Sequence, residues 1–218
     1  MKVYLSPSDQ VSNTYCVGGT NEAAQCREIC QLTVEALKRC GIDAKTNVKN
    51  GMGERVAESN AWGADLHVPV HTNGFNGTAD GTLLMCYDLK GEGYKASKAI
   101  FDVLAPMSPG SDYSIQARPD LYEVRASNAP CAYVEVAFHD NKVEAQWILD
   151  HKKEIAEALA KGICNYGGIE YKPEEAKMEE AGSYVVQSGL IDSVELAEEA
   201  VKALKSCGVD ATLMEVIH

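Results

Sequence analysis

The sequence predicts an α/β protein with a mainly parallel open sheet, helices on both faces, and a small C-terminal β-α-β unit. The first observation is that short strand-like runs alternate with helix-like runs along most of the chain. The second is that two apolar strand-like runs each end on a histidine, His71 and His139. The third is a glutamate-rich segment over 167–182 that separates the last unit. Such alternation is typical of parallel sheets whose functional site lies at the carboxyl ends of the strands.

The first half of the chain opens with a strand over 2–5 and a loop over 6–19 that is rich in Ser, Asn, Asp and Gly. The segment 20–40 has apolar residues at helical spacing, with Thr20 as the candidate N-cap and Gly41 as the stop. The other elements expected in this half are a strand over 42–48, a helix over 52–62 and a strand over 65–70.

The second half continues the alternation. The elements expected there are a strand over 81–87, a helix over 93–104, an irregular stretch over 106–119, strands over 121–124 and 131–136, and one or two helices over 142–164. We therefore divide the chain into a main domain over 1–166, an acidic linker over 167–182 and a C-terminal unit over 183–218. That unit is predicted to contain strands over 184–189 and 209–216 around a helix over 193–207.

Charge and hydropathy exclude two classes of partner. The chain of 218 residues carries a formal net charge of -12, so no basic cluster is present that could release counterions from nucleic-acid phosphates. No apolar stretch approaches the ~20 residues needed to span a bilayer. The first residues look like a β-strand and lack the apolar core of a signal peptide. We therefore expect neither a nucleic-acid nor a membrane partner.

The cysteines do not form a recognisable disulfide or metal pattern. The chain has eight cysteines but no C-x-x-C pair, and several lie in predicted helices or apolar strands. Scattered thiols of this kind fit a reducing environment better than a secreted, disulfide-stapled domain. A cysteine nucleophile, either Cys131 or Cys16 with a histidine, is disfavoured because neither follows a sharp turn or opens a helix.

Three ionisable residues stand where a parallel sheet presents its site. His71 ends an apolar run and is followed at once by the turn-forming Thr-Asn-Gly. Glu135 lies inside an apolar run, where a carboxylate needs a cation, a metal or hydrogen bonds. Its structural alternative is an ion pair with Arg118 or Arg125. Glu22 opens the first long helix, where the helix dipole alone would favour an acid.

The order of these motifs resembles the zinc-dependent N-acetylmuramoyl-L-alanine amidases of the Amidase_3 type over roughly residues 1–165. The motifs are Gly-Thr-Asn-Glu22 opening a helix, His71-Thr72-Asn73 after a strand, and Val134-Glu135 leading to Phe138 and Asn141. The resemblance implies that Glu22 and His71 are ligands of Zn²⁺ and that Glu135 is the catalytic base. It also implies hydrolysis of the amide that joins the lactyl group of N-acetylmuramic acid to L-alanine in peptidoglycan. With no signal peptide, such a protein is expected to be made in the cytoplasm and to act on the cell wall after release or lysis.

One departure from the resemblance concerns the metal ligands. The family's first strand is followed by a Gly-His-Gly segment that supplies another histidine, whereas this chain has Asp9 and Gln10 there and no histidine before His67. Three interpretations follow. His139 replaces the missing ligand, Asp9 supplies an oxygen ligand instead, or the metal site is lost and the protein is a non-catalytic peptidoglycan-binding relative.

Two further residues are candidates for substrate contact. Asn73 follows His71 in the turn-forming segment. Arg55 lies in a segment that resembles the family's loop and helix before the histidine strand, and it is expected either to touch a substrate carboxylate or to pair with Glu58 on the surface. His67 lies about 13 Å from His71 along the same strand face, so we interpret it as a core or interface histidine.

The C-terminal unit resembles half of a sporulation-related repeat (SPOR) domain, a module that binds glycan strands stripped of peptides. The resemblance rests on the segment from Tyr184 to Gly189, the following Ala/Glu/Lys-rich helix and the segment from Cys207 to Ala211. Because only one β-α-β half is present, two units are expected to pair in a homodimer. The alternative is docking of the unit on its own main domain.

Overall fold

The computed structural model describes residues 1–174 and 194–206, except for residues 50 and 112–113. The chain divides into two compact units, Met1–Glu175 and Ala176–His218. In the described residues, no helix is both long and apolar enough to cross a bilayer.

A single six-stranded sheet forms the centre of the first unit. Its strands are β1 (Lys2–Pro7), β2 (Asp43–Thr46), β3 (Leu66–Asn73), β4 (Leu83–Cys86), β5 (Ile115–Ala117) and β6 (Tyr133–Phe138). They lie in the order β2-β1-β3-β6-β4-β5, and each neighbouring pair is parallel except β4 with β6. The predicted mainly parallel sheet is confirmed.

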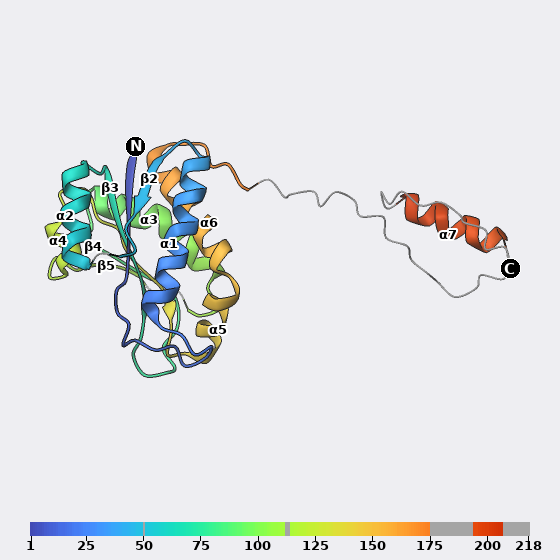
Figure 1. Cartoon of the computed structure of the whole chain (residues 1–218), viewed down its shortest axis with the longest axis horizontal. Helices are drawn as coiled ribbons and strands as arrows, with labels where there is room; N and C mark the ends of the chain where they lie inside the picture. The colour runs from blue at the N-terminus through green and yellow to red at the C-terminus, as the bar shows by residue number, and fades with distance from the viewer. Residues whose placement is uncertain (50, 112–113, 175–193, 207–218) are drawn as a thin grey trace. The chain divides into compact units, whose positions relative to one another are not determined.

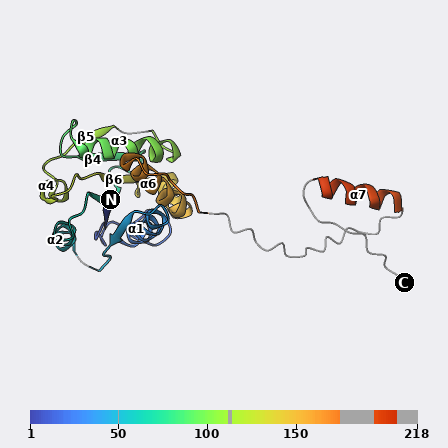
Figure 2. The ribbon, with the colours of Figure 1, turned by 90° about the horizontal axis from the view of Figure 1, so that it is seen from above.

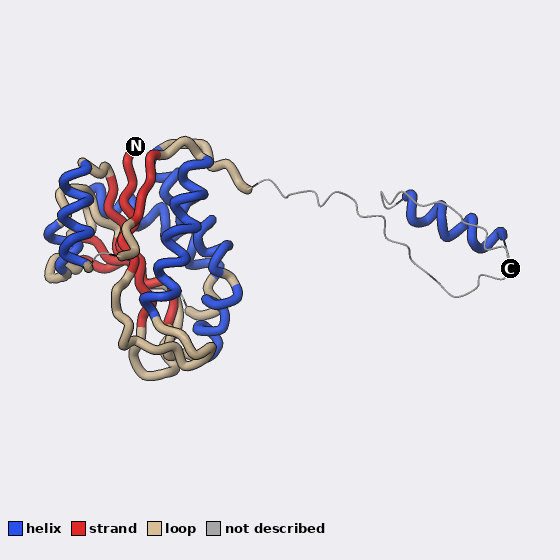
Figure 3. Tube along the Cα trace, viewed as in Figure 1, coloured by secondary structure: helices blue, strands red, loops and turns tan. Residues whose placement is uncertain are grey.

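Helices cover both faces of this sheet, as predicted (Figures 1 and 2). They are α1 (Glu22–Arg39), α2 (Met52–Trp62), α3 (Glu92–Leu104), α4 (Tyr122–Ala126), α5 (Lys142–Asp150) and α6 (Lys152–Gly167), with a short 3-10 turn over Ala105–Met107. Helices α1, α3 and α6 pack together on one face, and α2 and α4 lie on the other. Figure 3 shows long loops gathered where β1, β3 and β6 end.

The two faces of the sheet differ in chemistry because side chains alternate along each strand. On β3, Leu66, Val68 and Val70 join the main hydrophobic core against α1, α3 and α6. His67 and His71 alternate with them and lie on the opposite face, and both are buried. The face covered by α2 and α4 therefore holds buried polar groups beside a small second hydrophobic cluster of Met85, Val124, Cys131 and Tyr133.

Three local predictions are corrected by the structure. The segment 121–124 is not a strand, because Tyr122–Ala126 forms the short helix α4. The stretch 106–119 is not wholly irregular, because Ile115–Ala117 pairs with β4 as the edge strand β5. The N-cap of α1 is Asn21 rather than Thr20, and the Asn21 side chain accepts a hydrogen bond from the Ala24 N–H.

The first unit extends beyond the predicted boundary at residue 166. Ile169 and Tyr171 pack against the hydrophobic core, and the carbonyl of Lys172 accepts a hydrogen bond from Arg39 Nε at 2.8 Å. The start of the predicted linker over 167–182 is therefore part of the main domain.

In the C-terminal unit the structure describes one helix, α7 (Val194–Ser206), which matches the helix predicted over 193–207. The predicted strands over 184–189 and 209–216 lie outside the described residues.

Candidate active site

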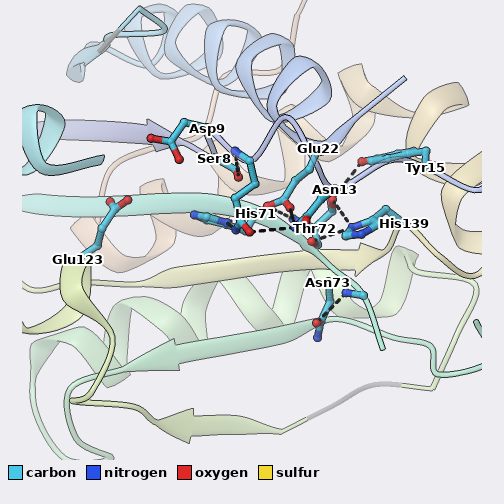
Figure 4. A network of polar contacts seen from close by, with 12 residues as sticks. Ser8, Asp9, Asn13, Tyr15, Glu22, His71, Thr72, Asn73, Glu123 and His139 are labelled. Atoms are coloured by element: carbon cyan, nitrogen blue, oxygen red, sulfur yellow. Dashed lines mark hydrogen bonds and ion pairs between the residues drawn. The ribbon is translucent and has the colours of Figure 1, made fainter. Parts of the chain in front are cut away.

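The centre of the candidate site is a contact between His71 and Glu22. His71 lies near the end of β3, and Glu22 is the first residue of α1, which follows the loop after β1. His71 Nδ1 lies 2.8 Å from Glu22 Oε1, and Figure 4 shows the two side chains facing each other. Glu22 is fully buried and His71 is 5% exposed. The structure thus brings together two of the residues that the sequence predicted as metal ligands.

Glu22 is held by several donors. Asn13 Nδ2 donates to its Oε2 at 2.6 Å, and the Thr72 N–H lies 3.4 Å from its Oε1. Burial alone would raise the pKa of Glu22, but the hydrogen bond and charge of His71, together with hydrogen bonds from Ser8 and Asn13, lower it. The carboxylate is therefore ionised in the folded protein.

His71 is the partner of this carboxylate. Burial would lower the pKa of His71, but the hydrogen bond to Glu22 and the negative charges of Glu135 and Glu22 raise it. Its ring stacks on Tyr133, with ring centroids 4.6 Å apart. Within the described part of the chain, the buried Nε2 has no hydrogen-bond partner. The contacts with Glu22 and Tyr133 hold the ring in place.

Glu135 lies beside His71 on the neighbouring strand β6. The two residues are paired in the parallel register, so their side chains project from the same face of the sheet. Although Glu135 is partly accessible as a residue, its Oε2 is buried and has no hydrogen-bond partner among the residues that the structure describes. Burial raises the pKa of Glu135 to about 7, the His71 and Arg118 charges lower it, and the Glu22 charge raises it. The ion pair with Arg118 or Arg125 is not among the ion pairs of the described residues.

The donor set at this point suits a metal ion only in part. Glu22 offers an oxygen and His71 a nitrogen, which are donor types that zinc accepts. Among the described residues, however, no three histidine, cysteine, aspartate or glutamate side chains are grouped so as to hold a metal ion. Two residues fit the expected site.

His139 is not part of that pair, which corrects the prediction that it is the third ligand. His139 Nδ1 lies 3.0 Å from the carbonyl oxygen of Thr72 and 3.1 Å from its hydroxyl oxygen. The ring also stacks on Tyr15, with centroids 5.6 Å apart. Because its Nδ1 donates to Thr72, the imidazole is fixed as a neighbour of the site.

Asp9, the alternative ligand, is committed elsewhere. Its Oδ2 accepts a hydrogen bond from the Met52 N–H at 2.9 Å at the start of α2 and lies 3.6 Å from Arg55 Nη2. Figure 4 shows its carboxylate turned away from Glu22. The prediction that Asp9 is a ligand is therefore corrected as well.

Arg55 is a buried residue rather than a surface one. It is 1% exposed, and its Nε donates to Ser6 Oγ at 2.9 Å. Glu58, the other predicted partner, binds Tyr4 and Lys45 instead. The predicted surface pair with Glu58 is wrong because this arginine belongs to the buried polar face of the sheet, and the contact with a substrate stays a prediction.

Asn73 lies at the end of β3, beyond the pair in Figure 4. Its Oδ1 accepts a hydrogen bond from the Gly74 N–H, and its carbonyl accepts one from the His139 N–H. Asn73 is half-buried, so a contact with substrate stays a prediction.

Two residues of the site were missed in the sequence. Tyr133 lies two residues before Glu135, and the period of a strand could have placed it on the same face. Asn13 lies in the loop after β1, and no local pattern marks it as the partner of Glu22.

Of the two cysteines considered as nucleophiles, Cys131 is buried and Cys16 is exposed. Cys131 is 4% exposed, and burial together with the Glu123 charge raises its pKa well above the ordinary value. Cys16 is exposed. A thiolate at Cys131 is therefore disfavoured.

The comparisons with known proteins agree on one group. The family model described as N-acetylmuramoyl-L-alanine amidase (Amidase_3) matches residues 9–165. An uncharacterized cell wall amidase of Bacillus anthracis is 30% identical over 146 residues, which cover 62% of this chain and 26% of that relative. The chain thus spans about a quarter of the length of the curated relative that it matches.

Solved structures share the fold. The catalytic domain of CwlV, an N-acetylmuramoyl-L-alanine amidase from Bacillus (Paenibacillus) polymyxa var. colistinus, aligns with a TM-score of 0.70 at 16% identity, over 78% of this chain and 100% of that one. The amidase AmiC2 of Nostoc punctiforme aligns with a TM-score of 0.69 at 18% identity, over 77% and 97%. At these identities the likeness concerns the fold.

Proposed function

Because this chain belongs to the N-acetylmuramoyl-L-alanine amidase family, we propose that it hydrolyses the amide bond between N-acetylmuramic acid and L-alanine in peptidoglycan. The observation that carries the proposal is Glu135, a carboxylate with a buried, unpartnered Oε2 beside the Glu22–His71 pair. A buried carboxylate without a structural partner is costly, so its retention points to chemistry.

We propose Zn²⁺ as the cofactor, with Glu22 Oε1 and His71 Nδ1 as two of its ligands. These atoms face each other and are held by other groups, Glu22 by Asn13 and His71 by stacking on Tyr133. A bound zinc ion would polarise the scissile carbonyl and lower the pKa of the attacking water.

The proton transfers are assigned to Glu135. Its carboxylate takes a proton from the attacking water and later gives a proton to the nitrogen of the leaving L-alanine peptide. A general base and acid works best when its pKa lies near the working pH, and burial raises the pKa of Glu135 to about 7. One side chain can therefore carry out both transfers.

The test is the Glu135→Gln variant, which keeps the size of the side chain and removes the proton acceptor. We expect at least a 10²-fold loss in the release of peptides with free N-terminal L-alanine from purified peptidoglycan. Glu92→Gln, at a residue away from the site, is the matched control and should keep wild-type activity. Full activity of Glu135→Gln would contradict the proposed role.

Removal of metal tests the cofactor separately. Dialysis against a chelator should abolish peptide release, and added Zn²⁺ should restore it. Binding to peptidoglycan without turnover, with or without Zn²⁺, would instead favour the non-catalytic relative.

For the C-terminal unit we propose pairing with a second copy to complete a glycan-binding sheet. The support is the SPOR-like sequence pattern and the helix α7 at the predicted place. Light scattering at high concentration tests the pairing, and a monomer there would contradict it.

A further inference from the structure

The proposed zinc site lacks one protein ligand. Catalytic zinc sites commonly use three protein ligands and leave a fourth position open. Glu22 and His71 supply two. Asp9 and His139, the ionisable candidates, are bound to the start of α2 and to Thr72, respectively.

Gln10 has a side chain that reaches the His71 ring of the pair. It follows β1 in the loop that leads to α1, and its Nε2 lies 3.3 Å from His71 Nδ1. Its Oε1 accepts a hydrogen bond from Asn13 Nδ2 at 2.9 Å, and the same Nδ2 donates to Glu22 Oε2. The amide of Gln10, the imidazole of His71 and the carboxylate of Glu22 therefore meet at one point.

The hydrogen bonding at that point is in conflict while the Gln10 amide nitrogen faces His71. His71 Nδ1 faces a carboxylate oxygen, to which it must donate, and an amide nitrogen, which is also a donor. It cannot satisfy both. A half-turn of the Gln10 amide would replace the nitrogen with Oε1, and a cation could then be held by two oxygens and Nδ1. The turn would cost the Asn13–Gln10 hydrogen bond, about 1 kcal/mol.

We propose that Gln10 supplies the third protein ligand of the zinc site, through its amide oxygen, together with Glu22 and His71. The proposal rests on the zinc-dependent function proposed above. With one carboxylate and neutral ligands, a bound Zn²⁺ keeps a net positive charge. The neutral amide of Gln10 preserves that charge, as a second histidine would, whereas the carboxylate of Asp9 would neutralise it. Gln10 is exposed, so its amide nitrogen can bind water after the turn.

The choice of ligand has a consequence for metal preference. Carbonyl and carboxylate oxygens suit Mn²⁺ and Mg²⁺, whereas imidazole suits Zn²⁺. With two oxygens and one nitrogen, the site should bind zinc less tightly than one with two histidines and should discriminate less against Mn²⁺.

The test is zinc affinity, measured on the full chain by competition with a chromophoric chelator. Gln10→Ala should weaken binding by at least tenfold, because loss of even an outer partner of a metal ligand costs 10–100-fold. Gln10→Glu, which retains an oxygen at the same place and adds a charge, should bind zinc at least as tightly as the wild type. Gln146→Ala, at a residue of α5 that bonds Asp150, is the matched control and should bind as the wild type does.

Asp9→Ala and His139→Ala separate the alternatives. Both should bind zinc within about threefold of the wild type, and a change in far-UV circular dichroism would reveal misfolding of any variant. Wild-type affinity in Gln10→Ala, or a tenfold loss in either of the other two with Gln10→Ala unaffected, would overturn the assignment. If the wild type binds no zinc, the zinc dependence fails as well, while peptide release still tests the amidase activity on its own.

Discussion

Two histidine–glutamate pairs lie along the same face of β3, and they differ in what surrounds them. In the first, His67 Nε2 lies 2.8 Å from Glu123 Oε2, and its Nδ1 lies 3.0 Å from Ser59 Oγ. In the second, His71 Nδ1 faces Glu22, but the buried Nε2 has no partner. Both rings are buried. The first pair has every ring nitrogen satisfied, and the second does not.

The position of each pair along the strand explains the difference. His67 lies near the start of β3, between α2 and α4, where Arg55 and Tyr4 also contact the pair or stack on it. His71 lies near the carboxyl end, where the strand gives way to loops and where open α/β sheets bind ligands. Burial of a histidine thus says little about function, whereas an unsatisfied nitrogen at a strand end is informative.

The largest expected effect comes from removing the carboxylate of the first pair. Glu123→Ala removes the buried carboxylate that His67 and Arg55 contact, so we expect the free energy of unfolding to fall by about 3–5 kcal/mol. Zinc affinity of the folded protein should be unchanged. Urea denaturation measures the first quantity and chelator competition the second.

The matched variant at the second pair is Glu22→Ala. It should abolish measurable zinc binding, with a smaller loss of stability than Glu123→Ala when both are compared without metal. Equal losses of stability would show that both pairs are structural, which would contradict the proposed difference between them.

The next effect is the pH dependence of stability caused by Glu135. Since its folded pKa is raised from 4.5 to about 7, its protonated form is favoured in the folded state. The stability that protonated Glu135 gives to the folded state is present in full below pH 4.5 and is lost as the pH rises through 7. Relative to Glu135→Gln, the chelator-treated wild type should therefore lose about 3 kcal/mol between pH 4.5 and 8.

Urea denaturation of both proteins across that range measures the difference. If the difference in the free energy of unfolding between the two proteins stayed constant with pH, Glu135 would be paired in the folded protein. Glu135 would then have a structural role like that of Glu123.

A smaller effect is expected from the polar neighbours of the pairs. Asn13→Ala removes a hydrogen bond to Glu22, so we expect a loss of zinc affinity of about 10-fold or more. Ser59→Ala removes the neighbour of His67 and should lower stability by about 1–3 kcal/mol without affecting zinc. Chelator competition and denaturation of both variants separate a ligand support from a structural contact. Loss of zinc affinity in Ser59→Ala would contradict the distinction.

The smallest difference is expected in the alkylation rates of the thiols near the two pairs. Burial and the charges of nearby carboxylates raise the pKa of Cys26 on the Glu22 side and of Cys131 on the Glu123 side. Both should resist alkylation in the native state, whereas the exposed Cys16 should react. Mass spectrometry after brief treatment with iodoacetamide measures this. Faster labelling of Cys26 than of Cys16 would show that the catalytic side is open to solvent.

Much of this arrangement could be predicted from local sequence. The alternation of Leu66, Val68 and Val70 with His67 and His71 places both histidines on one face, and the strand end identifies His71. The helix start identifies Glu22. These features depend on periodicity and on element ends, which single sequences display well.

The remainder depends on contacts between distant segments. In the sequence, Arg55 looks like an ordinary exposed residue of a helix. Its burial depends on contacts with Glu123 and Ser6, which are distant in the sequence. His139 directly follows β6, much as His71 lies near the end of β3, but Thr72 holds its ring. The strand predicted over 121–124 is a helix because α4 packs on α2, a contact that the sequence does not display.

The alternation of chemistry on β3 also bears on how the chain finds its register. A slip of one residue would exchange the two faces, placing both imidazoles in hydrocarbon and three aliphatic side chains among buried charges. Such a misaligned sheet would lose both carboxylate partners at once. The buried polar residues of β3 therefore also favour the correct register of the strand. Only a chain folded in that register would place His71 beside Glu22 for the proposed metal.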